Sequence, residues 1–320
     1  MLLVILEHDQ GAMAEAAREA LTFGRTLAGR MGVPMHAALI GSEDAALVAE
    51  AAGHGAARVH TVLHPVLEGF GPEAWGEVIA AMVGRLEPAA VLAGGSDRGN
   101  EVLAQAAARL DVPFVANCLD IDPADWSITR IQWGGSLLED VSLQTETVLV
   151  SCGRHAVASE PVPEPLTPSV EPFEVELDAA LSRTVVRDRV VLSAGVTLST
   201  APVVVGGGRG VGSAEGFAPL EELAELLGGK VGCSRAVTNN GWRPHADQVG
   251  QTGTRIAPEV YISSGISGAI QHWVGAMGSK HILAINLDPE ANIVTKADWA
   301  VIGDLHEVIP AIIAEIRSRR

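Results

Sequence analysis

Two glycines, a serine, a glutamine and a histidine stand close together in the segment GISGAIQH, residues 265–272. The segment follows the apolar run VYISS and precedes WVGAMGS, so the pattern places it where a strand ends and a helix begins. At such a junction backbone N–H groups converge, and they bind anions such as phosphate. Ser267 can cap the following helix or bind a phosphate oxygen. The segment therefore predicts an anion-binding site.

Polar residues also follow the other strands that the second half of the sequence predicts. In chain order these are Arg209 within GGGRG after PVVV, Ser234 and Arg235 after KVGC, Asn286 after HILAI, and Asp304 after WAVIG. A polar loop, QVGQTG (248–253), lies between the second and third of these strands. In an open parallel sheet, ligands bind beyond the carboxyl ends of the strands, so we expect all these groups at one edge.

This set has the chemistry of a nucleotide site. Glycines let backbone N–H groups approach a pyrophosphate, and Asn286 and Asp304 suit a ribose or an adenine edge. Arg209 and Arg235 add more positive charge than two phosphates at a helix terminus need. The extra charge suits a group that becomes anionic during function, such as a reduced flavin.

Strand and helix patterns alternate through the first part of the chain, which is typical of a parallel sheet with helices on both faces. The strands are predicted at 2–7, 34–41, 57–64, 89–95 and 113–121, and the helices at 13–30, 43–55, 73–86 and 99–111. Residues 127–152 then predict strands without intervening helices. The fold class is therefore α/β, with two domains that each contain a mostly parallel sheet flanked by helices.

A proline-rich stretch, residues 160–177, separates the two α/β patterns and is either a linker or an extended arm on the surface. One more strand is expected at 185–195. The second pattern begins at 202 with further strands at 259–263, 281–286 and 299–303, and with helices from about Ser213 and about Leu305. We place the boundary near 196–200, which gives an N-terminal domain of residues 1–197 and a C-terminal, doubly wound domain of residues 198–320.

Composition narrows the function classes. The chain has 320 residues, a formal net charge of −17, 22 Lys and Arg residues, and 48% apolar residues. The basic residues form no stripe, so nucleic acid is a poor partner, and the acidity favours solubility or the steering of a basic partner surface. The three cysteines are far apart and predict neither a disulfide framework nor a metal site, which favours a reducing cytoplasm. No apolar run reaches the length of a transmembrane helix, so we expect no membrane insertion.

The second half resembles the alpha subunit of electron transfer flavoprotein. The resemblance rests on VVVGGGRG (203–210), GCSRA (232–236), QVGQTG (248–253), VYISSGISGAIQH (260–272) and AINLDPEANI (284–293), in this order. In the first half it is carried by LLVILEHDQG and by AGGSDRGNEVLAQAAARLDVP (93–113). The resemblance implies one FAD, held mostly by the C-terminal domain. It also implies a beta subunit that forms a heterodimer with this chain, and a first domain that is structural and faces that subunit.

The resemblance assigns the cofactor contacts by motif. Arg209, Ser234 and Arg235 would lie at the flavin end, and Val249, Gly250, Gln251 and Thr252 would line it. The run Ser267, Gly268, Ala269, Ile270, Gln271 and His272 would hold the pyrophosphate and ribityl region, with His272 near the pyrimidine edge. Asn286, Asp304 and Leu305 would hold the adenosine half. Arg209, Arg235 and, as a third candidate cation, a protonated His272 would stabilise the negative charge of the reduced flavin.

The implied function is an electron carrier that accepts electrons from a partner dehydrogenase and passes them to an acceptor such as a quinone oxidoreductase. The sequence contains no evident nucleophile–base set, and we expect no substrate-transforming site. His36, His54, His60 and His64 lie in the first domain without a partnering motif and are expected on the surface. Two alternatives are an NAD-binding dehydrogenase subunit and a non-redox adenine-nucleotide module that uses the loop at 93–100. GGGRG argues against the first, because it lacks the GxGxxG spacing and the acid about 20 residues later.

Overall fold

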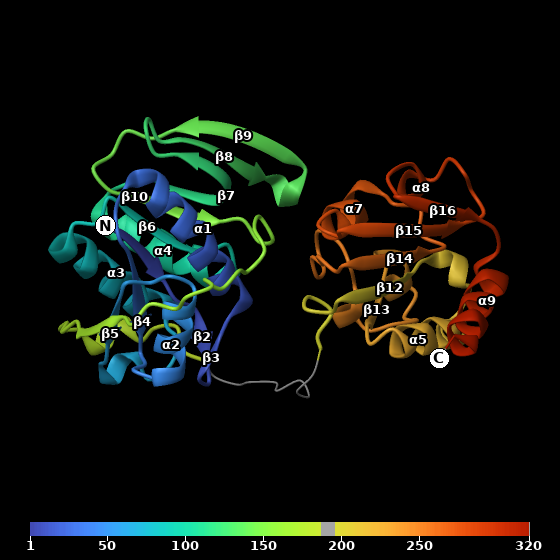
Figure 1. Cartoon of the computed structure of the whole chain (residues 1–320), viewed down its shortest axis with the longest axis horizontal. Coiled ribbons are helices and arrows are strands. Elements are labelled where there is room, and N and C mark those ends of the chain that lie inside the picture. The colour runs from blue at the N-terminus through green and yellow to red at the C-terminus, as the bar shows by residue number, and fades with distance from the viewer. Residues whose placement is uncertain (187–195, 320) are drawn as a thin grey trace. The chain divides into compact units, whose positions relative to one another are not determined.

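The computed structural model describes residues 1–186 and 196–319, which form two compact units (Figure 1). The first unit comprises Met1–Trp133 and Leu137–Val190, and the second consists mainly of Val191–Arg320. The strand expected at 185–195 lies almost wholly outside the described residues.

The first unit is built on a sheet whose described strands number nine, in the order β11-β5-β4-β1-β6-β10-β7-β8-β9. All of its neighbours pair in parallel except β7 with β8 and β8 with β9, which are antiparallel. The strands are β1 (Leu2–Ile5), β4 (Met35–Ile40), β5 (Arg58–Val62), β6 (Ala90–Gly94), β7 (Phe114–Asp122), β8 (Ser127–Gln132), β9 (Leu137–Ser142), β10 (Val148–Cys152) and β11 (Ser169–Pro172). A two-stranded ribbon, β2 (His8–Asp9) with β3 (Ala12–Met13), stands apart.

Helices cover both faces of this sheet, because successive side chains of the buried strands point to opposite sides. Leu2 and Val4 of β1 pack with α1 (Glu15–Met31) and α2 (Ala45–Gly53). Leu3 and Ile5 of the same strand pack with α3 (Pro72–Leu86) and α4 (Asp97–Leu110). Because both faces of β1 are buried, its sequence is a continuous apolar run. The predicted parallel sheet with helices on both faces is confirmed.

The proline-rich stretch is an extended arm and not a free linker. Its strand β11 pairs in parallel with β5, and the N–H of Phe173 donates to the carbonyl of Thr61 at 2.8 Å. The side chain of Phe173 is 8% exposed, and the guanidinium of Arg85 lies 3.6 Å from the centre of its ring. The arm thus extends the edge of the first sheet.

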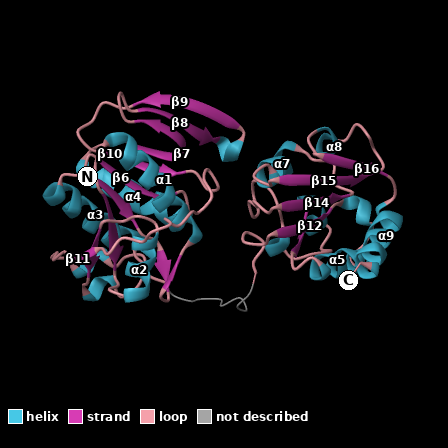
Figure 2. Ribbon diagram, in the orientation of Figure 1, coloured by secondary structure: helices cyan, strands magenta, loops and turns pink. Residues whose placement is uncertain are grey.

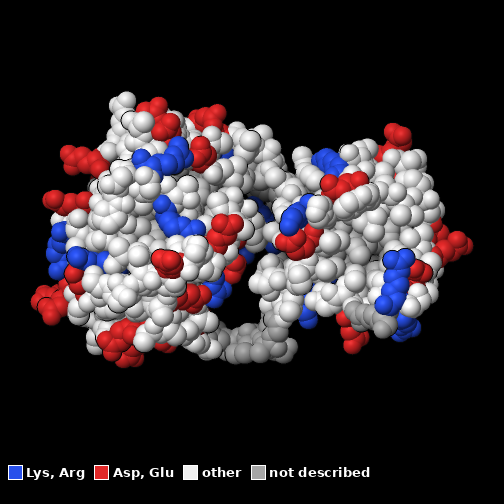
Figure 3. All heavy atoms as spheres, in the orientation of Figure 1, with Lys and Arg blue, Asp and Glu red and all other residues white. Residues whose placement is uncertain are grey.

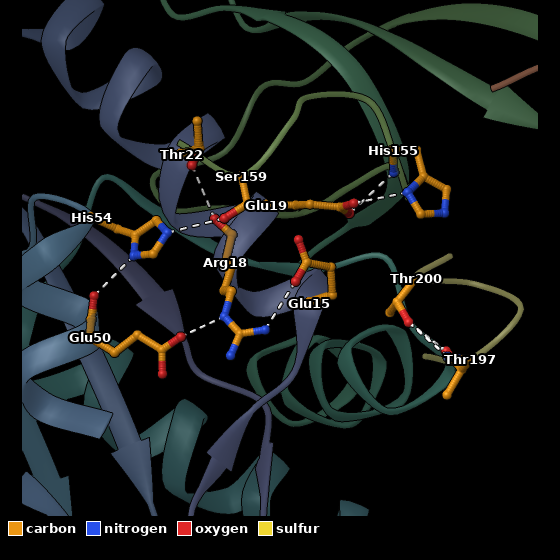
Figure 4. A network of polar contacts seen from close by, with 10 residues as sticks. All are labelled: Glu15, Arg18, Glu19, Thr22, Glu50, His54, His155, Ser159, Thr197 and Thr200. Atoms are coloured by element: carbon orange, nitrogen blue, oxygen red, sulfur yellow. Dashed lines mark hydrogen bonds and ion pairs between the residues drawn. The ribbon is translucent and has the colours of Figure 1, made fainter. Parts of the chain in front are cut away.

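Polar contacts join α1 to its neighbours in the first unit (Figure 4). Arg18 pairs with Glu15 on its own helix and with Glu50 on α2. Glu19 is 5% exposed, and its carboxylate accepts from the backbone N–H of His155 and lies 3.0 Å from Nδ1 of that residue. These contacts fix the chain that follows β10 against α1.

The surface position expected for the histidines of the first domain is wrong for two of them. His54 is 4% exposed, and its two ring nitrogens contact the carbonyl of Glu50 and the hydroxyl of Ser159. His60 is 3% exposed and lies 3.1 Å from His36, measured from Nε2 to Nδ1. Each is a buried histidine that meets a polar partner, which sequence spacing does not reveal.

The second unit contains a parallel sheet whose described strands have the order β13-β12-β14-β15-β16. The strands are β12 (Val203–Gly207), β13 (Lys230–Cys233), β14 (Val260–Ser264), β15 (His281–Asn286) and β16 (Trp299–Ile302). From β12 the chain moves outward to β13 and then returns past β12 to β14, so the strand order reverses between β12 and β14. This is a doubly wound topology, and its reversal point is where such sheets bind ligands.

Helices cover both faces of the second sheet as well (Figure 2). Helices α5 (Ala218–Leu226) and α9 (Leu305–Ser318) pack with Val205 and Ile262 on one face. The other face holds Val204 and Tyr261 and is covered by α7 (Ile270–Ala276) and α8 (Asn292–Thr295). The short α6 (Arg235–Asn239) follows β13 directly.

The acidic composition is visible on the surface. Acidic side chains are spread over the face shown in Figure 3, with basic groups interspersed. Among the described residues, no helix combines the length and the apolar character that crossing a membrane requires.

Candidate functional site

A cavity of about 470 Å³ lies at the carboxyl ends of β12 to β15 in the second unit. Its place at the reversal point of a doubly wound sheet follows from the topology. Its size falls within the usual range of roughly 300–1,000 Å³ for small-molecule sites. Nine predicted residues line it: Arg209, Ser234, Arg235, Ser267, Gly268, Ala269, Gln271, His272 and Asn286.

Glycines allow the chain segments that follow β12 and β14 to approach each other closely. The N–H of Gly208 donates to Ser264 at 2.9 Å, and that of Gly210 donates to Gly265 at 3.1 Å. A Cβ atom at Gly208 would stand 2.1 Å from the carbonyl oxygen of Gly265, so a larger residue does not fit. This close approach of the two loops places Arg209, between the two glycines, at the cavity.

The segment after β14 presents free backbone donors. Gly265 and Gly268 have φ values of +62° and +76°, which glycine adopts without strain. No backbone hydrogen bond between described residues uses the N–H groups of residues 267–271. Helix α7 begins at Ile270 with Ala269 as its N-cap and without a side-chain cap, so Ser267 does not cap it. The hydroxyl of Ser267 and these N–H groups are thus available to an anion.

The loop QVGQTG is hydrogen-bonded to α7 and to the end of β13. The N–H of Gln251 donates to the carbonyl of Gln271 at 2.7 Å, and the N–H of Val249 donates to Cys233 at 2.9 Å. The side chain of Gln248 accepts from Thr238 at 2.8 Å and donates to Thr252 at 3.0 Å. The four residues predicted in this loop, Val249, Gly250, Gln251 and Thr252, are not among the residues that line the cavity, and Gln251 bonds to one that is, Gln271.

His272 is the buried ionisable group of the cavity wall. It is 6% exposed, its Nε2 lies 2.8 Å from the hydroxyl of Tyr261, and its Nδ1 is buried without a hydrogen-bond partner. Burial lowers the pKa of His272 to about 4, although the nearby carbonyl of Val249 acts in the opposite direction. The ring is therefore neutral at pH 7 without a ligand, and the protonated His272 expected beside a reduced flavin stays a prediction.

Two arginines supply positive charge at the cavity. Arg209 and Arg235 are exposed, and neither takes part in an ion pair between described residues. One acid, Asp288, also lines the cavity. Unpaired guanidinium groups beside free N–H donors form an arrangement that favours an anionic ligand.

Three further predicted residues, Ile270, Asp304 and Leu305, are not among the residues that line the cavity. Ile270 is 55% exposed on α7. The carboxylate of Asp304 caps α9 by accepting from the N–H of His306 at 2.9 Å. Leu305 is 6% exposed and packs against the glycine loops of β12 and β14. Asn286 does line the cavity, and its amide also bonds to the carbonyl of Ile266 at 2.8 Å.

Sequence reasoning missed several residues of the wall. They are Ala236, Asn239, Ile266, Asp288 and Ala291. Asn239 follows Arg235 by four positions on a helix, a spacing that puts both on one face and could have indicated it. Asp288 and Ala291 belong to the turn after β15, and no spacing rule relates them to the other strand ends.

Comparisons with known proteins agree with this geometry. Residues 197–277 match the family described as the electron transfer flavoprotein FAD-binding domain, and residues 2–178 match the electron transfer flavoprotein domain. The chain is 34% identical over 323 residues to the electron transfer flavoprotein subunit alpha of Bacillus subtilis, covering 99% of this chain and 97% of that protein. It is also 34% identical over 327 residues to the subunit alpha of Mycobacterium tuberculosis strain H37Rv, covering 100% and 99%. The protein FixB of Clostridium saccharobutylicum is 34% identical over 320 residues, covering 98% and 96%.

Proposed function

The chain belongs to the electron transfer flavoprotein alpha-subunit family, and from this membership we propose that its second-unit cavity is the binding site of the FAD. As a member it is an FAD-containing electron carrier with a beta subunit as its partner. Neither the NAD-binding dehydrogenase subunit nor the non-redox nucleotide module is favoured by this membership.

One observation carries the proposed site: two kinds of unpaired group converge on one cavity. They are the backbone N–H groups of the segment 267–271 and the guanidinium groups of Arg209 and Arg235. Free N–H groups and the hydroxyl of Ser267 fit a pyrophosphate, since both donate to phosphate oxygens. Cations fit a ring system that gains negative charge. The residues present therefore suit FAD.

Bound FAD supplies the redox chemistry, and the protein binds the cofactor, orients it and tunes it electrostatically. In our proposal the 267–271 segment holds the pyrophosphate, and Asn286 holds the adenosine half together with Asp304 and Leu305. Arg209, Ser234 and Arg235 lie at the flavin end. Val249 to Thr252 shape that end, and they fix the position of α7 through the bond from Gln251 to Gln271.

The same proposal assigns roles to the larger parts. The N-terminal domain, residues 1–197, is structural and faces the beta subunit, and residues 198–320 form the FAD domain. Electrons come from partner dehydrogenases and go to a downstream acceptor such as a quinone oxidoreductase. The compartment is the reducing cytoplasm, which keeps the three buried cysteines as thiols.

The test is a visible absorption spectrum of the chain purified together with its beta-type subunit, followed by mass analysis of the released cofactor. A flavin spectrum with FAD released is the expected result. The variant Gly268→Ala, which fills the turn before α7, should lose most of the bound flavin. A colourless complex that takes up no added FAD would overturn the proposal.

A further inference from the structure

The loop QVGQTG (248–253) touches α7 at a point where both partners are glycines. Gly275 is buried in α7, and a Cβ atom there would stand 2.3 Å from both the Cα atom and the nitrogen of Gly250. In the opposite direction, a Cβ atom at Gly250 would stand 2.9 Å from the carbonyl oxygen of Gln271, which also belongs to α7. The loop and the helix are therefore in backbone-to-backbone contact, which a larger residue at position 275 does not permit.

Two hydrogen bonds hold this contact in place. The N–H of Gln251 donates to the carbonyl of Gln271 at 2.7 Å, and the N–H of Ile256 donates to the carbonyl of Gly275 at 2.8 Å. The two accepting residues stand four positions apart, so they lie on the same side of α7. One side of the helix is thus given over to the loop.

The loop is also closed on itself. The N–H of Thr254 donates to the carbonyl of Gln248 at 2.7 Å, and the carbonyl of Thr254 accepts from the N–H of Gly250 at 3.2 Å. A third bond runs from the N–H of Gly253 to the carbonyl of Gly250 at 3.1 Å. Because these bonds tie the segment together, a displacement at Gly250 is passed to all of residues 248–254.

We infer that Gly275 is a positioning residue for the cofactor, because its lack of a side chain lets the loop lie directly on α7 and so fixes the loop relative to the N–H groups of residues 267–271. The inference rests on the proposed FAD site and deepens it, since the loop belongs to the flavin end and those N–H groups to the pyrophosphate. Gly275 is not among the residues that line the cavity, so it acts through the loop and not by contact.

The size of the displacement follows from the contact distances. Carbon atoms in ordinary contact are roughly 3.5–4.0 Å apart, so an added Cβ atom at position 275 would push the loop and α7 apart by about 1 Å. Binding groups need to be held within about 0.5 Å of their productive positions. A methyl group outside the cavity should therefore weaken the binding of FAD.

The first experiment compares the FAD affinities of Gly275→Ala and Gly278→Ala in the complex with the beta subunit. Both variants add one methyl group, but at Gly278 the nearest atom would be a carbonyl oxygen at 3.2 Å. Gly275→Ala should lower the affinity by about 10-fold or more, because a misplacement of 1 Å is costly at a binding site. Gly278→Ala should leave the affinity within about twofold. Equal affinities for the two variants would overturn the inference.

A double-mutant cycle shows whether the effect passes through the loop. In a background that carries Gln251→Ala and Thr252→Ala, Gly275→Ala should lose at least about half of its effect on FAD affinity, since the displaced loop then has fewer contacts to lose. An undiminished effect in that background would mean that Gly275 acts through the helix alone and would overturn the inference.

Hydrogen exchange of the wild-type complex without FAD tests the contact itself and needs no variant to fold. If α7 holds the loop, the amides of Gln251 and Ile256 open together with the helix. Their protection should then be within about tenfold of that of Met277, whose N–H donates to the carbonyl of Trp273 at 2.8 Å at the end of α7. Lower protection of the two loop amides would overturn the inference. A wild-type complex that binds no FAD would instead overturn the proposed site, so the two failures are distinct.

Discussion

At the scale of single residues, the unpaired guanidinium of Arg209 carries the electrostatic role proposed for the cavity. Arg209→Ala removes a positive charge that favours the reduced, more negative cofactor, so the flavin potential should fall. For a largely exposed charge we expect an effect of about 0.2–1 kcal/mol, or roughly 10–40 mV for one electron. Spectroelectrochemical titration of the complex measures this change.

Arg317→Ala is the matched control, because Arg317 is exposed on α9 and pairs with Glu222 away from the cavity. The flavin potential of the Arg317→Ala complex should equal that of the wild type. An unchanged potential in Arg209→Ala would remove this arginine from the tuning of the cofactor.

Gly268 tests the turn that presents the free donors. Its φ is +76°, and a Cβ atom would stand 2.4 Å from the backbone nitrogen of Ile293. Gly268→Ala should therefore destabilise the second unit by at least about 1–2 kcal/mol, the usual cost of a left-handed residue. Gly29 on α1 has nothing within 4 Å of the same position, so Gly29→Ala should stabilise the first unit by about 0.4–1 kcal/mol. Urea unfolding of both variants gives the two values, and a Gly268→Ala protein as stable as the wild type would contradict the strain.

Sequence reasoning located the cavity-lining residues that directly follow a strand. Arg209, Ser234 and Asn286 each come within two positions of a strand end, so the topology alone brings them together. It failed where a local contact decides the side-chain direction. Asp304 also follows a strand, but its carboxylate bonds to the next helix, because a short acid at that position caps an N-terminus well.

At the scale of elements, the neighbouring strands β4 and β5 share the pair His36 and His60. Burial lowers the pKa of both, that of His36 to about 4, and the positive charge of either ring opposes protonation of the other. Arg58 also faces the pair and lowers both pKa values, while Glu171 of β11 raises them. The pair is therefore neutral in the folded protein at pH 7.

This neutrality makes the stability of the first unit depend on pH. The unfolded chain binds protons at these rings near pH 6.5, earlier than the folded chain does, so stability is complete above about pH 6.5 and is lost as the pH falls toward 4. With allowance for partial exposure, His36 should account for about 1–2 kcal/mol of this loss.

Urea unfolding at pH 7.5 and pH 4.5 tests the dependence. His36→Gln should lose less stability between the two pH values than the wild type does. His306→Gln, on the exposed surface of α9, should lose as much as the wild type. Equal losses in all three proteins would exclude the strand pair as the cause.

Most helices and strands follow from local patterns, and the agreement is close. The predicted strand at 281–286 is β15, and the predicted helix at 73–86 is α3 within one residue. Local patterns did not predict the pairing of β11 with β5. Whether the proline-rich stretch is a linker or an arm depends on the burial of Phe173 against the first sheet and its helices. Such contacts join residues more than 100 positions apart, so the spacing of apolar residues along the chain cannot predict them.

At the scale of the whole molecule, every residue that lines the cavity belongs to the second unit, within residues 209–291. A ligand stabilises the folding unit that binds it, by about 2.7 kcal/mol when its concentration is 100 times its dissociation constant. FAD should therefore stabilise this unit and not the first sheet with its helices. Amides that exchange through unfolding of the second unit should slow by roughly 100-fold, because 1.4 kcal/mol corresponds to a factor of ten.

Hydrogen exchange measured by mass spectrometry on the complex with the beta subunit, before and after FAD is removed, compares the two units in one sample. Peptides from β12, β14 and α7 should exchange faster without FAD, and peptides from β1, β4 and β6 should be unchanged. Equal changes in both sets would mean that FAD binding is coupled to the first unit. Coupling is not expected, because the strands β1, β4 and β6 supply no group to the cavity among the described residues.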